Sequence, residues 1–427
     1  MNVLGLIVEY NPFHNGHLYH LNSAKKIVSP DYTVAVMSGN FVQRGEPAII
    51  NKFSRTETAL NMGIDIVFEL PFVYATQSAG TFANGSIGVL ERTNVVTDIV
   101  FGSESSNIEY LKKISNVLIT QKKEYTNLLK YYLKKGLSFP NARKEALKKF
   151  FDNDTDIEKI VEKSNDILGI EYLNNLNYYN SKIIPHTIQR HGSDYNDSEF
   201  KGKLSSATAI RKLIFENKIS KIENSVPKKT LEILKREISK GNGPINLEKM
   251  REIILYKLRL SEREDITDIL DIKEGLDKRF IEYSKRSKDI NDLLKKVKSK
   301  RFTYTRVKRS MLNILFDLKD YEYKKYAEYG PQYLRVLGFN KKGQKLLNII
   351  KKKSKYPIIT TPSQYYQIYK KLIKDLKNED KKYDSIPEIF LEQIKYDFKA
   401  SNIYSLLYQN KISSSYEEDM IKKVIML

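Results

Sequence analysis

The sequence predicts an α/β fold, with a parallel sheet covered by helices in the first half and a mainly helical, strongly basic second half. Two observations support this prediction. In the first half, short apolar runs alternate with segments of helical spacing, which is typical of a parallel sheet buried on both faces. The charge is unequal, because residues 1–215 carry a net +3 and residues 216–427 carry the other +18 of the total +21.

Five segments of the first half have the apolar character of strands and are followed by Gly, Pro, Asn or Ser: Val3–Val8, Thr33–Met37, Asp65–Leu70, Asp98–Phe101 and Lys182–Gln189. Pro185 indicates that the fifth is an edge strand or a strand end, because Pro cannot donate to a sheet ladder. Helices are expected between the strands, as at His17–Ile27 and Phe53–Met62. Residues 108–180 are expected to be largely helical and to include an insertion. Ligands of such sheets bind at the carboxyl ends of the strands.

A domain boundary is predicted between about residues 215 and 245, where Asn224, Pro227 and the run Gly241-Asn242-Gly243-Pro244 interrupt the pattern. We therefore expect one domain at residues 1–225 and a second at residues 226–427. The helices predicted in the second domain are Leu247–Arg259, Leu293–Lys300, Arg306–Leu318 and Pro362–Asn378.

The composition excludes several classes of protein. A chain of 427 residues that is 41% hydrophobic is too apolar to be a disordered polyelectrolyte. It contains no cysteine, which excludes disulfide scaffolds, cysteine-ligated zinc and thiol catalysis. No apolar run approaches the ~18 residues of a membrane-spanning helix, and the first residues lack the features of a secretory leader. We expect a cytoplasmic protein without a membrane partner.

Basic residues of the second half gather in two clusters. The first comprises Lys285, Arg286, Lys288, Lys295, Lys296, Lys298, Lys300, Arg301, Arg306, Lys308 and Arg309, and the second Lys341, Lys342, Lys345, Lys351, Lys352, Lys353 and Lys355. Phe302, Tyr304, Tyr333 and Phe339 lie among them, and aromatic rings in a basic field can stack on unpaired bases. A general compositional bias toward Lys, Asn, Ile and Tyr is the alternative explanation for the basic residues, but it does not explain why the two halves differ in net charge. The clusters predict binding of a nucleic acid by the second half.

The motif His14-Asn15-Gly16-His17 directly follows the first predicted strand, and helical spacing continues after it. It places two imidazoles in the first turn of a helix, where backbone N–H groups and the helix dipole favour an anion. Gly16 lets a phosphate approach the backbone, and two His donors can stabilise charge on a phosphoryl group during transfer. A zinc site and purely structural histidines are the alternatives. A zinc site is poorly supported, because the sequence has no cysteine and the motif does not have the HExxH spacing.

This early HxGH motif resembles that of the nucleotidylyltransferase superfamily, whose members have a Rossmann-like fold. A second motif, Ser206-Ala207-Thr208-Ala209-Ile210-Arg211, is similar to the late SxTxIR signature of the superfamily. In that signature a helix N-terminus and its Arg hold the ATP phosphates. The two motifs together are much more specific than either alone.

Longer segments resemble one family, the bacterial tRNA(Met) cytidine acetate ligases. These segments are LGLIVEYNPFHNGHLYHL, GEPAIINKFSRTETAL, FELPFVYATQSAGTFANG, FGSE, NDILGIEYL, TIQRHGSDYND and YTRVKRSMLNILF. The resemblance implies activation of acetate by ATP to acetyl-adenylate and acetylation of the wobble cytidine of elongator tRNA(Met), which gives N4-acetylcytidine. It implies a catalytic domain at 1–225 and a tRNA-binding domain at 226–427. ATP would be the co-substrate, together with Mg²⁺, and no metal ligand of the protein is expected.

The resemblance also implies the site residues. The ATP-binding loop would be Ile7, Val8, Glu9, Tyr10, Asn11, Pro12, Phe13, His14, Asn15, Gly16, His17, Leu18, Tyr19 and His20. Further ATP contacts would be Gly102, Asn165, Arg190, Ser206 and Thr208. The catalytic residues would be His14, His17, Arg190 and Arg211. One departure from the family is Asn196, where its members usually have His.

The candidate tRNA contacts are Lys52, Arg55, Lys295, Lys296, Lys298, Lys300, Arg301, Arg306 and Arg309. Lys52 and Arg55 are candidates for a phosphate clamp as well, with a solvated helix face as the alternative. A base for the acetyl-transfer step cannot be chosen among carboxylates such as Glu9, Glu69 and Glu104. Two other functions stay open: a small-molecule ligase that forms an acyl-adenylate, as pantothenate synthetase does, and a non-enzymatic RNA-binding protein.

Overall fold

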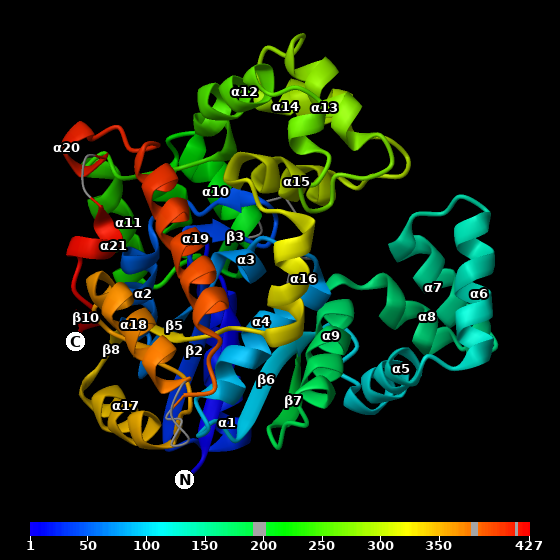
Figure 1. The fold of residues 1–427 in the computed structure, drawn as a ribbon. Helices are drawn as coiled ribbons and strands as arrows, with labels where there is room; N and C mark the ends of the chain where they lie inside the picture. The colour runs from blue at the N-terminus through cyan, green and yellow to red at the C-terminus, as the bar shows by residue number, and fades with distance from the viewer. Residues whose placement is uncertain (191–201, 377–382, 415–416) are drawn as a thin grey trace.

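The computed structural model describes residues 1–190, 202–376, 383–414 and 417–427. One central sheet runs through the molecule with helices on both faces (Figure 1). Two groups of helices project from this body. One is the cyan and green group α5–α8, and the other is the yellow-green group α12–α14 beside α15.

Five strands of the first half form the parallel part of the sheet, in the order β5-β2-β1-β6-β7. They are β1 (Val3–Val8), β2 (Tyr32–Ser38), β5 (Ile66–Leu70), β6 (Asp98–Ser103) and β7 (Ile184–Gln189). All five predicted strands are confirmed, and β7 lies at the edge that Pro185 indicated. Successive residues of β2 alternate between the two apolar clusters on opposite faces of the sheet, as in a strand buried on both sides.

The helices of the first half cover this sheet and include the predicted helical segment. The covering helices are α1 (Asn15–Val28), α2 (Lys52–Asn61), α3 (Phe72–Ala75), α4 (Ala79–Arg92) and α9 (Ser164–Tyr178). Between β6 and α9 the projecting group comprises α5 (Ile108–Thr120), α6 (Lys123–Lys134), α7 (Phe139–Phe150) and α8 (Thr155–Glu162). A short hairpin of β3 (Phe41–Val42) and β4 (Glu46–Pro47) follows β2.

The second half is mainly helical, as predicted. Its helices are α10 (Ala207–Phe215), α11 (Lys228–Ser239), α12 (Arg251–Leu260), α13 (Leu276–Ser284), α14 (Ile290–Val297), α15 (Tyr304–Phe316), α16 (Asp320–Tyr329), α17 (Lys341–Lys353), α18 (Tyr365–Asp375), α19 (Pro387–Ser405), α20 (Lys411–Ser414) and α21 (Glu418–Ile421). Within the described ranges, none of the helices combines the length and the apolar character that a membrane crossing requires.

The second half also completes the sheet, which the sequence did not predict. β8 (Leu334–Phe339) pairs antiparallel with β5, and β9 (Ile358–Ile359) and β10 (Ile425–Met426) pair parallel with β8. One apolar cluster joins residues from Val3 to Tyr408. The boundary near residue 225 stays a prediction, but residues beyond it share the sheet and the core with the first half.

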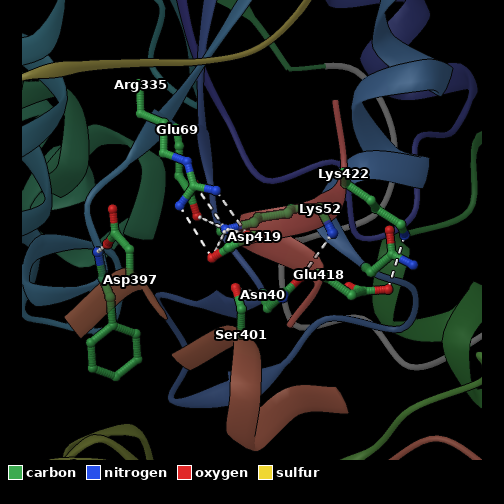
Figure 2. Close-up of polar contacts among 12 residues, drawn as sticks. Asn40, Lys52, Glu69, Arg335, Asp397, Ser401, Glu418, Asp419 and Lys422 are labelled. Carbon is green, nitrogen blue, oxygen red and sulfur yellow. Dashed lines mark hydrogen bonds and ion pairs between the residues drawn. The ribbon is translucent and has the colours of Figure 1, made fainter. Parts of the chain in front are cut away.

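Four buried charges connect these elements (Figure 2). The ammonium of Lys52 on α2 lies 2.7 Å from a carboxylate oxygen of Glu69 on β5 and 2.9 Å from one of Asp419 on α21. The guanidinium of Arg335 on β8 contacts the same two carboxylates at 3.0 and 2.8 Å. No side chain of the four is more than 4% exposed. Two cations and two anions therefore neutralise one another inside the protein and join α2, β5, β8 and α21.

We predict that Lys52→Met lowers the free energy of unfolding by about 3–5 kcal/mol, because it leaves a buried carboxylate without its partner. Lys422→Met is the matched control. Lys422 also forms an ion pair, with Glu418 at 2.9 Å, but its side chain is 39% exposed, so we expect a loss below about 1 kcal/mol. Chemical denaturation of both variants is the measurement. Equal losses would contradict the role given to Lys52.

Candidate active site

A cavity of about 220 Å³ opens at the carboxyl ends of β1, β6 and β7. It lies where the topology of a parallel sheet predicts a ligand. Most of the expected site residues line it, namely Ile7, Val8, Glu9, Tyr10, Asn11, His14, Gly16, His17, Tyr19, His20, Gly102, Asn165, Arg190, Ser206, Thr208 and Arg211. Residues from five separate parts of the first half thus meet in one place.

The HNGH motif folds as the cap of α1. The backbone N–H of Gly16 donates to Nδ1 of His14 at 3.0 Å, and the backbone N–H of His14 donates to Nδ1 of His17 at 3.3 Å. The two rings stack with their centroids 3.8 Å apart. A Cβ at Gly16 would lie 2.8 Å from the His14 ring, so only glycine fits beneath it. Because both Nδ1 atoms accept, each neutral ring carries its proton on Nε2 and can donate from there.

These rings are neutral at physiological pH. Burial and the nearby Arg190 and Arg211 lower the pKa of His14 to about 3. Burial and the adjacent His14 place the pKa of His17 well below its usual value, and burial lowers that of His20 to about 4. The cavity therefore offers an anion the N–H groups of uncharged imidazoles, together with the fixed charges of Arg44, Arg190 and Arg211.

Four residues of the expected ATP loop do not line the cavity: Pro12, Phe13, Asn15 and Leu18. Phe13 is 1% exposed, and its ring lies 4.5 Å from that of Tyr10 and 5.6 Å from that of His17. Asn15 donates from its side chain to the carbonyl of Asn224 at 2.8 Å. Phe13 thus packs against the ring of His17, and Asn15 ties the start of α1 to residue 224. Contacts of these four residues with ATP stay a prediction, because the four do not line the cavity.

The second motif forms the N-terminus of α10. Ser206 caps this helix, accepting from the backbone N–H of Ala209 at 3.0 Å. Arg211 donates to the carbonyl of Asn11 at 2.8 Å and to the carboxylate of Glu46 at 3.2 Å. Since Ser206 and Thr208 line the cavity along with Gly16, the N-termini of two helices border one space. That arrangement suits a polyanion such as a triphosphate.

Gly102, Asn165 and Arg190 form another wall of the cavity. Arg190 donates to the amide oxygen of Asn165 at 2.7 Å, and the Asn165 amide donates to Glu104 at 2.6 Å. A Cβ at Gly102 would lie 3.0 Å from the Arg190 side chain, so this glycine makes room for the arginine. Asn196 falls in residues 191–201, outside the described part of the chain.

Lys52 and Arg55 differ from expectation, because they are only 0% and 1% exposed. Lys52 belongs to the buried ion cluster. Arg55 donates to the carbonyls of Glu9 at 2.6 Å, Ser38 at 3.0 Å and Ile50 at 3.3 Å, and to that of Gly39. This burial contradicts both a contact with RNA and a solvated face. Arg55 instead fixes the carboxyl ends of β1 and β2, where the cavity begins.

The β3–β4 hairpin supplies cavity residues that the sequence analysis missed, namely Val42, Gln43, Arg44 and Glu46. Glu46 accepts from Arg211 and, at 2.9 Å, from Lys308 on α15. Gly45 has a φ of +73°, and a Cβ there would lie 2.7 Å from the backbone nitrogen of Arg309. The hairpin is therefore packed between the cavity and α15. In the sequence, the turn residues Arg44-Gly45-Glu46 were the feature that could have indicated this hairpin.

Apolar side chains form the remaining wall of the cavity. They are Phe82, Phe101, Leu168, Tyr172 and Ile188. Because they come from two helices, α4 and α9, and two strands, β6 and β7, that are far apart in sequence, no local motif indicated them.

The first basic cluster lies between α13 and α14, on α14, on the turn after it and on α15. Lys295, Lys298, Lys300 and Arg301 are exposed. Lys296 is half-buried and donates to Asp292 at 2.7 Å, and Arg306 and Arg309 are also half-buried. Phe302 and Tyr333 are 3% and 1% exposed, so these two rings cannot stack on bases as expected, because they belong to apolar cores.

Within the described ranges no group of three or more His, Asp or Glu side chains could hold a metal ion. The zinc alternative for the HNGH motif thus has no further ligands among these residues. In addition, the Nδ1 atoms of His14 and His17 already accept hydrogen bonds from the backbone.

Comparison with known proteins identifies similar chains. The model of a family described as HIGH Nucleotidyl Transferase matches residues 1–419. The tRNA(Met) cytidine acetate ligases of Thermosipho melanesiensis and Fervidobacterium nodosum are 53% and 51% identical, over 100% of this chain and 99% of each relative. Two crystal structures of Thermotoga maritima TmcAL match 100% of both chains. The apo form has a TM-score of 0.96 at 46% identity, and the form bound with alpha-thio ATP has 0.93 at 45%.

We predict that acid destabilises this site. An unfolded His14 titrates near 6.5 but the folded one near 3, so below pH 6.5 the unfolded chain binds a proton that the folded chain does not. Stability is fully present above pH 6.5, and each pH unit below it costs about 1.4 kcal/mol from His14 alone. Asn is also a good N-cap, so His14→Asn should retain the cap and reduce this slope. Denaturation of both proteins between pH 7 and 5 is the measurement. An unchanged slope would contradict the buried, neutral state of the ring.

Proposed function

Because the chain belongs to the HIGH nucleotidyl transferase family, and within it to the tRNA(Met) cytidine acetate ligases, we propose that it uses ATP to activate acetate and acetylates the wobble cytidine of elongator tRNA(Met). The products would be N4-acetylcytidine, AMP and pyrophosphate. It is an ATP-dependent ligase. The observation that supports this most is the cavity where two helix N-termini, two neutral stacked imidazoles and three arginines meet.

The first step needs no base on the protein. Acetate is ionised at pH 7, since carboxyl groups titrate near 4, so one of its oxygens attacks the α-phosphorus of ATP directly. Pyrophosphate leaves with the electrons of the broken P–O bond. The protein contributes orientation and charge compensation from Nε2–H of His14 and His17, from the backbone at Gly16, and from Arg190 and Arg211.

Mg²⁺ belongs to the same proposal as a companion of ATP. The described residues hold no acidic or histidine cluster for it, which fits a Mg²⁺ ion that is held chiefly by phosphate oxygens and water. When bound, it would neutralise phosphate charge. A cytoplasmic location is proposed as well, because the acceptor is a tRNA.

The basic cluster on α14 and the turn after it is proposed to bind the tRNA backbone. Its exposed side chains are Lys295, Lys298, Lys300 and Arg301. This cluster is connected to the cavity, because Lys308 on α15 contacts Glu46, which contacts Arg211. The anticodon base would have to leave its stack to reach the cavity. Arg306, Arg309 and Lys296 are weaker proposals because they are half-buried.

The alternatives explain less of the molecule. A small-molecule acyl-adenylate ligase would use the cavity but leave the basic surface without a role, and an RNA-binding protein without catalysis would leave the cavity without one. Incubation with ATP, acetate and bulk tRNA, followed by nucleoside analysis, separates the three functions. Acetylcytidine supports the proposal, whereas turnover without tRNA, or binding without turnover, supports one of the others.

We predict that His17→Ala lowers acetate-dependent exchange between ATP and pyrophosphate by about 10²–10³-fold, because it removes a preorganised donor to the reacting phosphate. His186→Ala is the matched control. That ring bonds to Asp98 at 2.8 Å and does not line the cavity. If His17→Ala exchanged ATP and pyrophosphate as fast as His186→Ala does, the role of His17 as a donor to the phosphate would be ruled out.

We further predict that changing Lys295, Lys298 and Lys300 to Gln weakens tRNA binding and lowers the slope of log affinity against log salt by about 2, while exchange is retained. The control carries the same change at Lys341, Lys345 and Lys352, which are exposed on α17 at the opposite end of the molecule (Figure 1). Filter binding over a salt series measures both variants. Equal slopes for the two would remove the tRNA assignment from α14.

A further inference from the structure

The second step of the proposed reaction has a requirement that the first lacks. The exocyclic amine of cytidine is a poor nucleophile because its lone pair is delocalised into the ring, and it must lose a proton as it forms an amide. A group in the cavity that can accept this proton accelerates the step. Of the described side chains that line the cavity, only two are carboxylates, Glu9 and Glu46, and three are imidazoles.

We propose that Glu9 is the general base of acetyl transfer, accepting the N4 proton of cytidine at its second carboxylate oxygen. This inference rests on the proposed function and names a catalytic residue for its second step.

Two carboxylates considered from the sequence are excluded by their positions. Glu69 is held by Lys52 and Arg335 inside the buried ion cluster and does not line the cavity. Glu104 accepts from the side-chain amide of Asn165 at 2.6 Å and from the backbone of Asp166 at 3.0 Å, and it does not line the cavity either. Both are occupied by structural partners.

The other cavity groups are poor proton acceptors. Both oxygens of Glu46 bind a cation, Arg211 at 3.2 Å and Lys308 at 2.9 Å, and although burial opposes it these cations lower its pKa. The two stacked histidines accept backbone N–H groups at Nδ1, so their free nitrogens already carry protons. The ring of His20, with a pKa of about 4, is a weak base.

Glu9 differs from all of these in its bonding. Its Oε1 accepts from the backbone N–H of Gln43 at 2.7 Å, which orients the carboxylate between β1 and the hairpin. Among the described residues no donor contacts its other oxygen. Arg55 holds the Glu9 carbonyl at 2.6 Å, so the residue is fixed by its backbone as well. Burial raises the pKa of Glu9, which makes the carboxylate a stronger base than an exposed one.

The step balances as follows. The N4 lone pair attacks the carbonyl carbon of acetyl-adenylate and forms the N–C bond. The C–O bond to the phosphate breaks, and its electron pair leaves on AMP. The N4 proton passes to Glu9 and from there to water, so the carboxylate is regenerated and no further reactant is needed.

The test is Glu9→Gln, which retains the shape and the acceptor for Gln43 but cannot take the proton. We expect acetylation of tRNA under single-turnover conditions to fall by about 10²–10⁴-fold. Hydroxylamine is a strong nucleophile that needs no base to attack acetyl-adenylate. Formation of acetohydroxamate from ATP, acetate and hydroxylamine reports the activation step and any contact of Glu9 with ATP, so we expect it to fall by a smaller factor than tRNA acetylation under the same conditions.

The other outcomes overturn the inference. A parallel loss of hydroxamate would place Glu9 in activation or folding, and loss of tRNA affinity by filter binding would place it in substrate binding. Normal tRNA acetylation would mean that the base is elsewhere, for example a phosphate oxygen of the adenylate itself. If the unaltered protein makes hydroxamate but no acetylcytidine, the proposed function fails, and that result does not depend on Glu9.

Discussion

Two buried cations on α2 determine where the active site lies. Arg55 binds the carbonyls at the carboxyl ends of β1 and β2, and Lys52 joins the same helix to β5, β8 and α21 through the ion cluster. A buried cation is tolerated only where partners replace its water, so each of these side chains constrains several segments at once. The loop that carries His14 leaves β1 immediately after Glu9. The position of the two stacked imidazole rings therefore depends on contacts made by a helix that does not carry them.

The cavity favours an anion without relying on a protonated histidine. Two stacked imidazolium ions would repel each other and the adjacent arginines, whereas neutral rings stack and still donate from Nε2. The permanent positive charges that line the cavity are those of Arg44, Arg190 and Arg211, and Arg190 is positioned by Asn165. Of the described residues, Glu9 and Glu46 are the acidic ones in this lining, and Glu46 is paired with Arg211 and Lys308. A carboxylate beside a phosphate site weakens nucleotide binding, and the proposed role of Glu9 as a base gives a reason for placing one there.

Periodicity and motifs predicted the parts of the molecule whose causes are local. The five parallel strands, the edge position indicated by Pro185 and the two capped motifs could all be found in the sequence. Burial could not. Lys52 and Arg55 have the spacing of an exposed helix face. Only the fold shows that Lys52 is buried in the ion cluster with residues of β5, β8 and α21, and that Arg55 is buried against the ends of β1 and β2. β8 itself escaped prediction because its apolar run is short and sits between basic clusters, and because its partner β5 lies more than two hundred residues earlier. Phe13 and Asn15 were assigned to ATP by resemblance, although their side chains support the loop from behind.

The span of the ion cluster along the chain has a consequence for synthesis. Lys52 and Asp419 are separated by 367 residues. As the chain is made, Lys52, Glu69 and Arg335 are present before Asp419, so the cluster lacks one of its two carboxylates until α21 has been made. Closing so long a loop is entropically costly, and the native arrangement gains the compensating attraction only when it closes. The first half can form its strands early, but the charges of the ion cluster are balanced only when α21 joins it.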